Sequence, residues 1–504
     1  MTLGAGGVMV LTKRGRVRGV LADGVAAFKG VPYAAPPFGV NRFKPPQPHQ
    51  PWSGELDAST YGPSVPAPPY PPPVDKLLTQ PQIPGEECLN LNVWTPDQGA
   101  AGLPVMVWIH GGAFTNGSGA IPTYDGGSFA RHGVVLVTLN YRLGVEGFLR
   151  LEDCSPNLGL LDQIAALKWV QDEIQAFGGN PDRVTVFGES AGGSSIAALM
   201  AMPAARGLFG RAICQSGPGA GLATSEEATL VAARLAASLG VRPTREAFGT
   251  IPADRLLAAQ RQLSAQARAS SLDPVGSARR LRAFAPVIDG DLLPGRPVDI
   301  IRAGASKDVR LIVGSNTDEH RLWLVPGGLI DSIDEETLQR SARAHGLEPD
   351  AIEAYRSGRP GATPGPTPGD VYASLLSDQY FRVPSIRLAE AHLEAGGATW
   401  MYEFAWPSPQ FGGRLGACHA LEIGFVFNNL GKGRAGLHGE DPPRDLAATM
   451  HQAWVRFATT GDPGWQPYDL LKRPTMIFWP TCKTIDDPRA PERMAWEGLL
   501  NEGP

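Results

Sequence analysis

The sequence has few cysteines, and they form no recognisable pattern. Its 504 residues include five, an odd number, at Cys88, Cys154, Cys214, Cys418 and Cys482. They are widely spread, with no CxxC pair and no Cys/His cluster at zinc-binding spacing. We therefore expect reduced thiols, without a disulfide framework or a structural metal ion.

Long hydrophobic runs and targeting signals are also missing. No stretch of about 18 apolar residues occurs anywhere in the chain. The basic residues near the N-terminus follow a short apolar run, which is the reverse of a secretory signal. We expect no membrane span and a cytoplasmic location. The net charge of −5 gives no reason to expect nucleic acid or an anionic membrane as a partner. Nothing in the sequence selects between a monomer and a dimer.

Short apolar runs separated by helix-length segments predict an α/β fold with a large, mostly parallel sheet. The runs are residues 104–109, 134–139, 183–187 and 310–314. They are apolar on both faces, as strands buried in a parallel sheet must be. Residues 158–179 have apolar positions at helical spacing and end in two glycines. Because this helix lies between two predicted strands, we expect a βαβ crossover.

The rest of the chain divides into loops and helices. Residues 61–76, 356–370 and 431–445 are rich in proline and glycine and predict surface loops or lids. Between about residues 220 and 360 the chain is rich in Ala, Leu and Arg, which predicts a mainly helical subdomain over the sheet. With no repeat of fixed period and no long flexible linker, we expect residues 1–504 to form a single domain.

The sequence VTVFGESAGG, residues 184–193, places Ser190 between a predicted strand and a predicted helix. In that context GxSxG predicts a sharp turn that holds a nucleophilic serine in a strained conformation above the sheet edge. Gly188 and Gly192 have no Cβ to collide in such a bend. The helix directs its first amides, including that of Ala191, at the place where negative charge would develop. Glu189 could tune the field there or only cap the helix, and a purely structural glycine turn is the alternative for the whole motif.

A serine nucleophile needs a base and a carboxylate that orients the base, and in α/β-hydrolases both follow the serine in the chain. Of the six histidines after Ser190, His419 lies on a small-residue loop before an apolar segment, as a mobile base requires. For the acid, a predicted strand runs into a polar loop with adjacent Asp318 and Glu319, and the residues alone do not separate the two. Cys418 is a weaker candidate nucleophile, because sequence neighbours such as Cys418 and His419 usually point apart.

The sequence VWIHGGAF, residues 107–114, follows another predicted strand and offers backbone amides for an oxyanion hole. We assign Gly112 and Ala113 as donors together with Ala191; Ala113 keeps its N–H despite its methyl group. Phe114 adjoins this loop and Trp323 adjoins the acid loop. Both are candidate pocket walls, with core packing as the alternative.

Further motifs occur in a fixed order across nearly the whole chain. They are GVPYAAPPFGVNRFKPPQP, EECLNLNVWTP, WIHGGAF, LNYRLGVEGFL, NLGLLDQIAALKWVQDEIQAFGGNPDRVTVFGESAGG, GSNTDEH, CHALEIGFVF and WVRFATTGDP. In these motifs the chain resembles the type-B carboxylesterase family, which includes bacterial para-nitrobenzyl esterases and the cholinesterases. The resemblance implies the α/β-hydrolase fold, a small-molecule ester substrate and no cofactor. It also implies that Ser190 is the nucleophile, Glu319 rather than Asp318 the acid, and His419 the base.

The chain departs from the family pattern in places. Cys88 is the first cysteine, so the disulfide that secreted members form from its segment cannot be made, which fits a reducing compartment. His320 stands where the family commonly has glycine, and either narrows the site or faces solvent. The proline-rich rim, residues 61–85, aligns poorly with the family pattern, so the way in which the substrate enters is the feature that transfers least from the family. Two alternatives remain: the same site acting on amides or thioesters or in acyl transfer, and a catalytically silent binding protein, which the complete triad disfavours.

Overall fold

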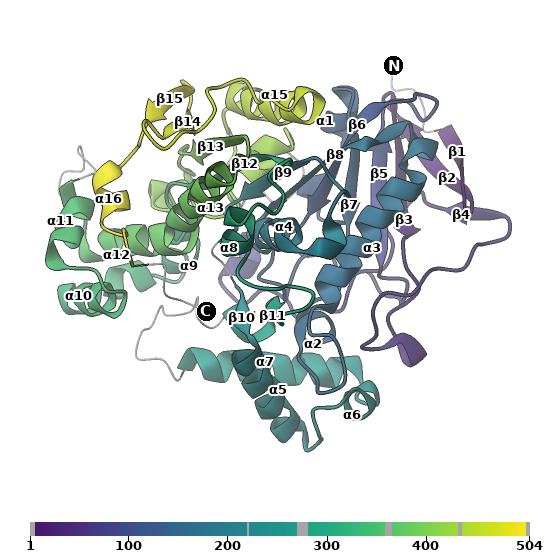
Figure 1. Cartoon of the computed structure of the whole chain (residues 1–504), viewed down its shortest axis with the longest axis horizontal. Coiled ribbons are helices and arrows are strands. Elements are labelled where there is room, and N and C mark those ends of the chain that lie inside the picture. Colours follow the sequence, from purple (N-terminus) through teal and green to yellow (C-terminus); the bar gives the residue numbers. More distant parts are fainter. Residues whose placement is uncertain (1–5, 219–220, 270–280, 358–364, 432–435, 500–504) are drawn as a thin grey trace.

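The computed structural model describes residues 6–218, 221–269, 281–357, 365–431 and 436–499, and a thirteen-stranded sheet forms its centre (Figure 1). In sheet order the strands are β1 (Gly6–Thr12), β2 (Gly15–Ala22), β3 (Val25–Pro32), β5 (Asn90–Thr95), β7 (Val135–Leu139), β6 (Leu103–Ile109), β8 (Gly179–Glu189), β9 (Arg211–Gln215), β12 (Arg310–Asn316), β13 (Thr399–Phe404), β14 (Pro474–Phe478) and β15 (Lys483–Asp486). The short β4 (Glu55–Asp57) pairs with β2.

The strands from β7 to β14 are parallel, and antiparallel strands extend the sheet at both edges. The strands predicted from the four apolar runs are confirmed as β6, β7, β8 and β12. Side chains of β6 alternate between two cores, with Val105 and Val107 in one and Met106 and Trp108 in the other. Both faces of the sheet are therefore buried, which explains why these strands are apolar on both sides.

Helices cover both faces. α3 (Leu158–Glu173), α4 (Ala191–Ala201), α8 (Pro297–Arg302) and α13 (Val383–Glu394) share one core, and α1 (Gly127–Arg131) and α15 (Arg444–Thr460) share the other. The predicted crossover is confirmed: the chain passes from β7 through α2 (Gly144–Phe148) and α3 to β8, and these two strands flank β6. After α3, one 3₁₀ turn leads to Gly178, whose φ of 86° ends the helical segment.

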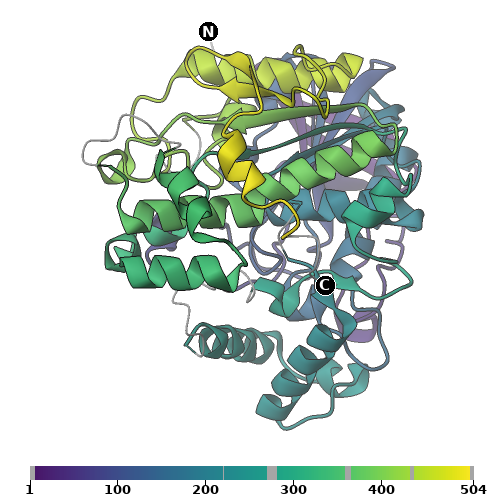
Figure 2. The same cartoon turned by 60° about the vertical axis from the view of Figure 1, so that its left-hand side comes forward.

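The range from 220 to 360 contains two groups of helices with β12 between them. The first group, α5 (Ser225–Leu239), α6 (Arg245–Gly249) and α7 (Ala253–Ala269), lies beyond the sheet at one end of the molecule (Figures 1 and 2). The short pair β10 (Ala223–Thr224) and β11 (Val287–Ile288) adjoins it. After β12 come α9 (Arg321–Leu324), α10 (Glu335–Ala344) and α11 (Pro349–Ser357). The last two pack with α12 (Pro368–Ser377), and α11 also packs on α16 (Ala490–Met494). This range therefore contributes a strand to the main sheet as well as helices.

Two of the predicted loops are shorter than expected. Residues 368–370 begin α12 and residues 444–445 begin α15, because proline and acidic residues are favourable in a first helical turn. Parts of both loops, 358–364 and 432–435, lie outside the described residues. The loop 61–76 is irregular except for the 3₁₀ turn Val74–Lys76. All five cysteines are free thiols. Among the described residues, no helix combines the length and the apolar character that crossing a membrane requires.

Candidate active site

Ser190 lies on the sharp turn between β8 and α4. Its backbone has φ 56° and ψ −121°, a region that costs a non-glycine residue about 1–3 kcal/mol. Its N–H donates to the carbonyl oxygen of Gln215 on β9 at 2.9 Å, which holds the turn in place. A Cβ on Gly192 would lie 1.9 Å from the carbonyl oxygen of Ile109, and one on Gly188 would lie 2.5 Å from the same atom. The turn can pack this closely against β6 only because both positions are glycine.

His419 and Glu319 form a buried pair. His419 Nδ1 lies 2.6 Å from Glu319 Oε2, and the His419 N–H donates to the Glu319 carbonyl oxygen at 3.2 Å. The neighbouring Asp318 faces another way, because its carboxylate accepts from the Ala417 N–H at 3.1 Å and lies 3.4 Å from Arg321. The geometry thus pairs Glu319, and not Asp318, with His419, a choice that the residues alone had left open.

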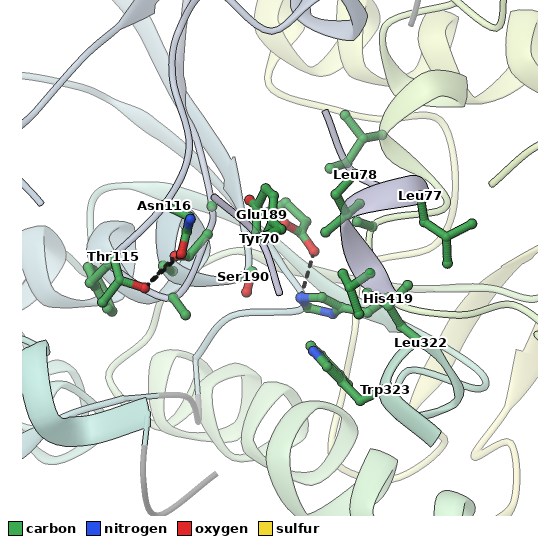
Figure 3. A pocket seen from close by; sticks show the side chains of 18 of the residues that line it. Tyr70, Leu77, Leu78, Thr115, Asn116, Glu189, Ser190, Leu322, Trp323 and His419 are labelled. Atoms are coloured by element: carbon green, nitrogen blue, oxygen red, sulfur yellow. Dashed lines mark hydrogen bonds and ion pairs between the residues drawn. The ribbon is translucent and has the colours of Figure 1, made fainter. Parts of the chain in front are cut away.

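The other ring nitrogen of His419 contacts Glu189. His419 Nε2 lies 3.0 Å from Glu189 Oε1 (Figure 3), so the ring sits between two carboxylates. The Glu189 carboxylate therefore contacts the ring of His419, and the Ser190 side chain at the N-cap of α4 makes no capping hydrogen bond. Ser190 lines the same cavity as His419, but its Oγ makes no hydrogen bond within the described residues. In this resting arrangement Nε2 is engaged by Glu189 instead of Ser190.

The charges around His419 change the protonation of the site. Burial alone would lower the pKa of His419, but the carboxylates of Glu189 and Glu319 outweigh burial and raise the pKa well above its ordinary value. Burial also raises the pKa of Glu189. Burial first, and then the charges of Glu189 and Glu319, raise the pKa of Glu422 to about 8. The surroundings therefore favour the protonated form of both the His419 imidazole and the Glu422 carboxyl in the resting site.

Asn316, at the end of β12, ties the acid loop to the base loop. Its N–H donates to Glu319 Oε1 at 2.7 Å, and its side-chain amide donates to the Cys418 carbonyl oxygen at 2.8 Å and to Glu422 Oε2 at 2.7 Å. Gln215 donates to the other oxygen of Glu422 at 3.0 Å. Sequence reasoning missed Glu422, although a lone carboxylate in the apolar segment 420–427 was a usable signal.

The loop after β6 presents backbone amides beside the nucleophile. Gly112 and Ala113 have φ of 111° and 55°, so the loop is held in an unusual conformation. Gly111 packs against the turn, since a Cβ there would lie 3.1 Å from Ser190 Cβ. In the described part of the chain, the N–H groups of Gly112, Ala113 and Ala191 donate no hydrogen bond. These are the three amides predicted as oxyanion donors.

A cavity of about 490 Å³ opens beside Ser190. The predicted wall residues Phe114 and Trp323 both line it, and the Trp323 ring centroid lies 4.9 Å from that of His419. Other aromatic and aliphatic walls were not predicted: Tyr70, Leu77, Leu78, Tyr380 and Phe381. The first three belong to the proline-rich rim, which has no periodic pattern. The last two lie on the π-helical turn Asp378–Arg382, and helical spacing in a sequence does not distinguish a π turn from an α turn.

Cys418, the alternative nucleophile, and His438, another histidine of the cavity wall, make other contacts. Cys418 is fully buried and is not part of the cavity wall, and burial raises its pKa well above the ordinary value for a thiol. His438 lines the cavity, but its Nε2 donates to the Leu421 carbonyl oxygen at 3.0 Å. Burial lowers the pKa of His438 to about 4. Within the described ranges, neither residue pairs with a carboxylate as His419 does.

A mostly parallel sheet with this strand–serine–helix turn at its centre defines the α/β-hydrolase fold. The model of the carboxylesterase family matches residues 7–488. The chain is 40% identical to the para-nitrobenzyl esterase of Bacillus subtilis over 96% of this chain and 97% of that one. It is 37% identical to the phenmedipham hydrolase of Pseudarthrobacter oxydans, over 95% and 93%. A crystal structure of a Geobacillus stearothermophilus carboxylesterase matches with a TM-score of 0.84 at 37% identity, over 97% of this chain and 99% of that one. The chain belongs to the carboxylesterase family and is a carboxylic ester hydrolase.

Proposed function

We propose that this carboxylesterase works through an acyl-enzyme formed on Ser190. The observation that carries the proposal is the buried His419–Glu319 pair, 2.6 Å apart, in the cavity that Ser190 also lines. Ser190 Oγ attacks the ester carbonyl carbon, His419 Nε2 takes the hydroxyl proton, and the same proton then goes to the leaving alcohol. Glu319 fixes the ring and stabilises its charge. Water repeats the cycle to release the acid, and no cofactor takes part.

The contact between His419 and Glu189 adds a step before the attack. Nε2 has to lose its proton and turn from Glu189 to Ser190 Oγ before it acts as a base. In the proposal, the amides of Gly112, Ala113 and Ala191 bind the oxyanion. Each such donor contributes about 10²–10³ in rate in enzymes where one has been removed.

We propose uncharged esters with an aromatic group as the substrate class. A cavity of about 490 Å³ with several aromatic walls supports this, since apolar pockets of that size hold drug-sized ligands. The relatives named for para-nitrobenzyl esters and phenmedipham support it too. The carboxylates of Glu189 and Glu319 beside His419 disfavour an anionic substrate.

We also propose a cytoplasmic location, which the five free thiols support. We propose that the chain forms a single domain, which the continuous sheet supports.

Replacing His419 tests the proposal. We expect His419→Ala to fold normally and to lower kcat on p-nitrophenyl butyrate by about 10⁴-fold or more, because the serine loses its base. His438→Ala is the matched control, since it removes a second histidine from the same cavity. Far-UV circular dichroism checks folding in both variants. Loss of turnover in His438→Ala but not in His419→Ala would show that the base is wrongly assigned. A p-nitroanilide assayed beside the ester distinguishes an esterase from an amidase.

A further inference from the structure

His320 is a buried polar side chain in the cavity wall that the proposed mechanism does not use. It is 3% exposed and lines the cavity. Its ring centroid lies 5.0 Å from that of Trp323 and 5.9 Å from that of Phe381. The same two rings lie 4.9 and 4.7 Å from His419. A substrate group that packs on Trp323 and Phe381 is therefore close to both histidines.

The ring of His320 has no hydrogen-bond partner among the described residues. Its backbone N–H donates to Ser377 Oγ at 3.0 Å, and its carbonyl accepts from the Trp323 N–H at 3.1 Å. In the part of the chain that the structure describes, none of the hydrogen bonds involves the imidazole. Of its two nitrogens, Nδ1 is the enclosed one, and it is buried without a partner. A proton on Nδ1 would be a buried unpaired donor, which is costly, so the proton of the neutral ring is carried by Nε2.

We propose that His320 is a substrate-binding residue whose Nε2–H donates a hydrogen bond to an uncharged acceptor oxygen of the ester substrate, such as an ether or a second carbonyl oxygen. The acceptor lies against the wall formed by Trp323, Tyr380 and Phe381. Nε2 faces the cavity and has no hydrogen-bond partner among the described residues, so it bonds to the substrate only when the substrate supplies an acceptor, and it favours substrates that carry one. The inference rests on the proposed function, because the cavity is taken to be the substrate site.

The electrostatics of the cavity select an uncharged acceptor. Burial, followed by the charge of His419, lowers the pKa of His320 to about 3, so its ring stays neutral wherever the base can act. A neutral ring offers no ion pair to a carboxylate. Glu189 and Glu319, which contact His419, would repel an anionic group placed nearby.

Matched pairs of substrates test the proposal, with the oxygen in either half of the ester. For the acyl half we compare p-nitrophenyl 3-ethoxypropanoate with p-nitrophenyl hexanoate, and for the alcohol half 2-propoxyethyl butanoate with hexyl butanoate. In each pair an oxygen replaces one CH₂. The readout is the kcat/KM of the ester with the extra oxygen divided by the kcat/KM of its all-carbon partner. We expect His320→Phe to lower this ratio by about threefold to tenfold in one of the two pairs, the effect of losing one neutral hydrogen bond. His320→Gln restores a donor and recovers part of the preference.

His438→Phe is the control, because His438 lines the same cavity but its Nε2 already donates to Leu421. We expect it to keep the wild-type ratio in both pairs. If the ratio in His320→Phe stays within about twofold of wild type in both pairs, the proposal is wrong. If His320→Phe does not fold, the same ratio is measured in His320→Ala. Failure of the proposed function is distinguishable, because Ser190→Ala would then still hydrolyse the four esters at the wild-type rate.

Discussion

His419 is held between two glutamates, and their charges set the pH at which its ring can accept a proton. Glu319 contacts Nδ1 at 2.6 Å and Glu189 contacts Nε2 at 3.0 Å. Both stabilise the imidazolium ion, so the neutral base forms only above the ordinary pKa of histidine. In the proposed mechanism, the contact at Nε2 also has to break before Ser190 can give up its proton. Glu189 is thus expected to restrain the base at low pH.

Replacing Glu189 tests this restraint. The acidic limb of kcat/KM against pH reports the pKa of the base in the free enzyme. We expect the limb of the wild-type enzyme to lie above pH 6.5, the ordinary pKa of histidine. Glu189→Gln removes one of the two charges that raise the pKa of His419, so its limb moves to lower pH. Glu246→Gln, on the exposed surface of α6, is the control and leaves the profile unchanged. A limb that stays in place or moves to higher pH in Glu189→Gln would contradict the electrostatic account.

The turn between β8 and α4 can form because α4 approaches β6 with no side chain between them. α4 packs on β6, β8 and β9, and its second residue, Gly192, meets the last carbonyl of β6. The atom that an added Cβ would meet is backbone, which cannot rotate away. The strained Ser190 backbone therefore depends on glycine at this position.

We expect Gly192→Ala to lower the free energy of unfolding by about 1–3 kcal/mol, as overpacking of a close contact does, and to abolish turnover. Gly210→Ala is the matched control: nothing lies within 4 Å of its added Cβ, so it should behave like wild type. Urea denaturation followed by tryptophan fluorescence gives the comparison. A Gly192→Ala protein with the denaturation midpoint and activity of wild type would show that the turn does not need this close packing.

Some elements could be predicted from local pattern and others could not. β6, β7, β8, β12 and α5 have apolar runs or helical spacing with clear ends, such as the capping box of Thr224 and Glu227 on α5. The turn at Ser190 follows from its own glycines. The wall formed by Tyr380 and Phe381 depends on one π turn inside a continuous helical stretch, which changes the direction of these side chains without altering the pattern. The rim that carries Leu77 and Leu78 is positioned by tertiary contacts instead of any local preference.

The site gathers residues from four separate parts of the chain at one edge of the sheet. Ser190 follows β8, the amide loop follows β6, and Glu319 follows β12; His419 lies beyond β13. The carboxyl ends of parallel strands meet at the same edge, which is why a sequence with this fold could be expected to bring them together. The sequence does not show the side-chain geometry, including the contact of Glu189 with His419 and the hydrogen bonds of the Asn316 side chain with Cys418 and Glu422. Those contacts join residues about a hundred or more positions apart, and no local pattern encodes them.

The central claim is that Ser190 is the nucleophile of this carboxylesterase, and covalent labelling tests it most directly. The folded enzyme is incubated with an alkyl fluorophosphonate, and the adduct is located by intact mass and peptide mapping. We predict one adduct per chain on Ser190, formed in step with the loss of esterase activity, and no adduct in Ser190→Ala. An inactivated enzyme labelled at another residue, or an active enzyme that takes up no label, would contradict the account.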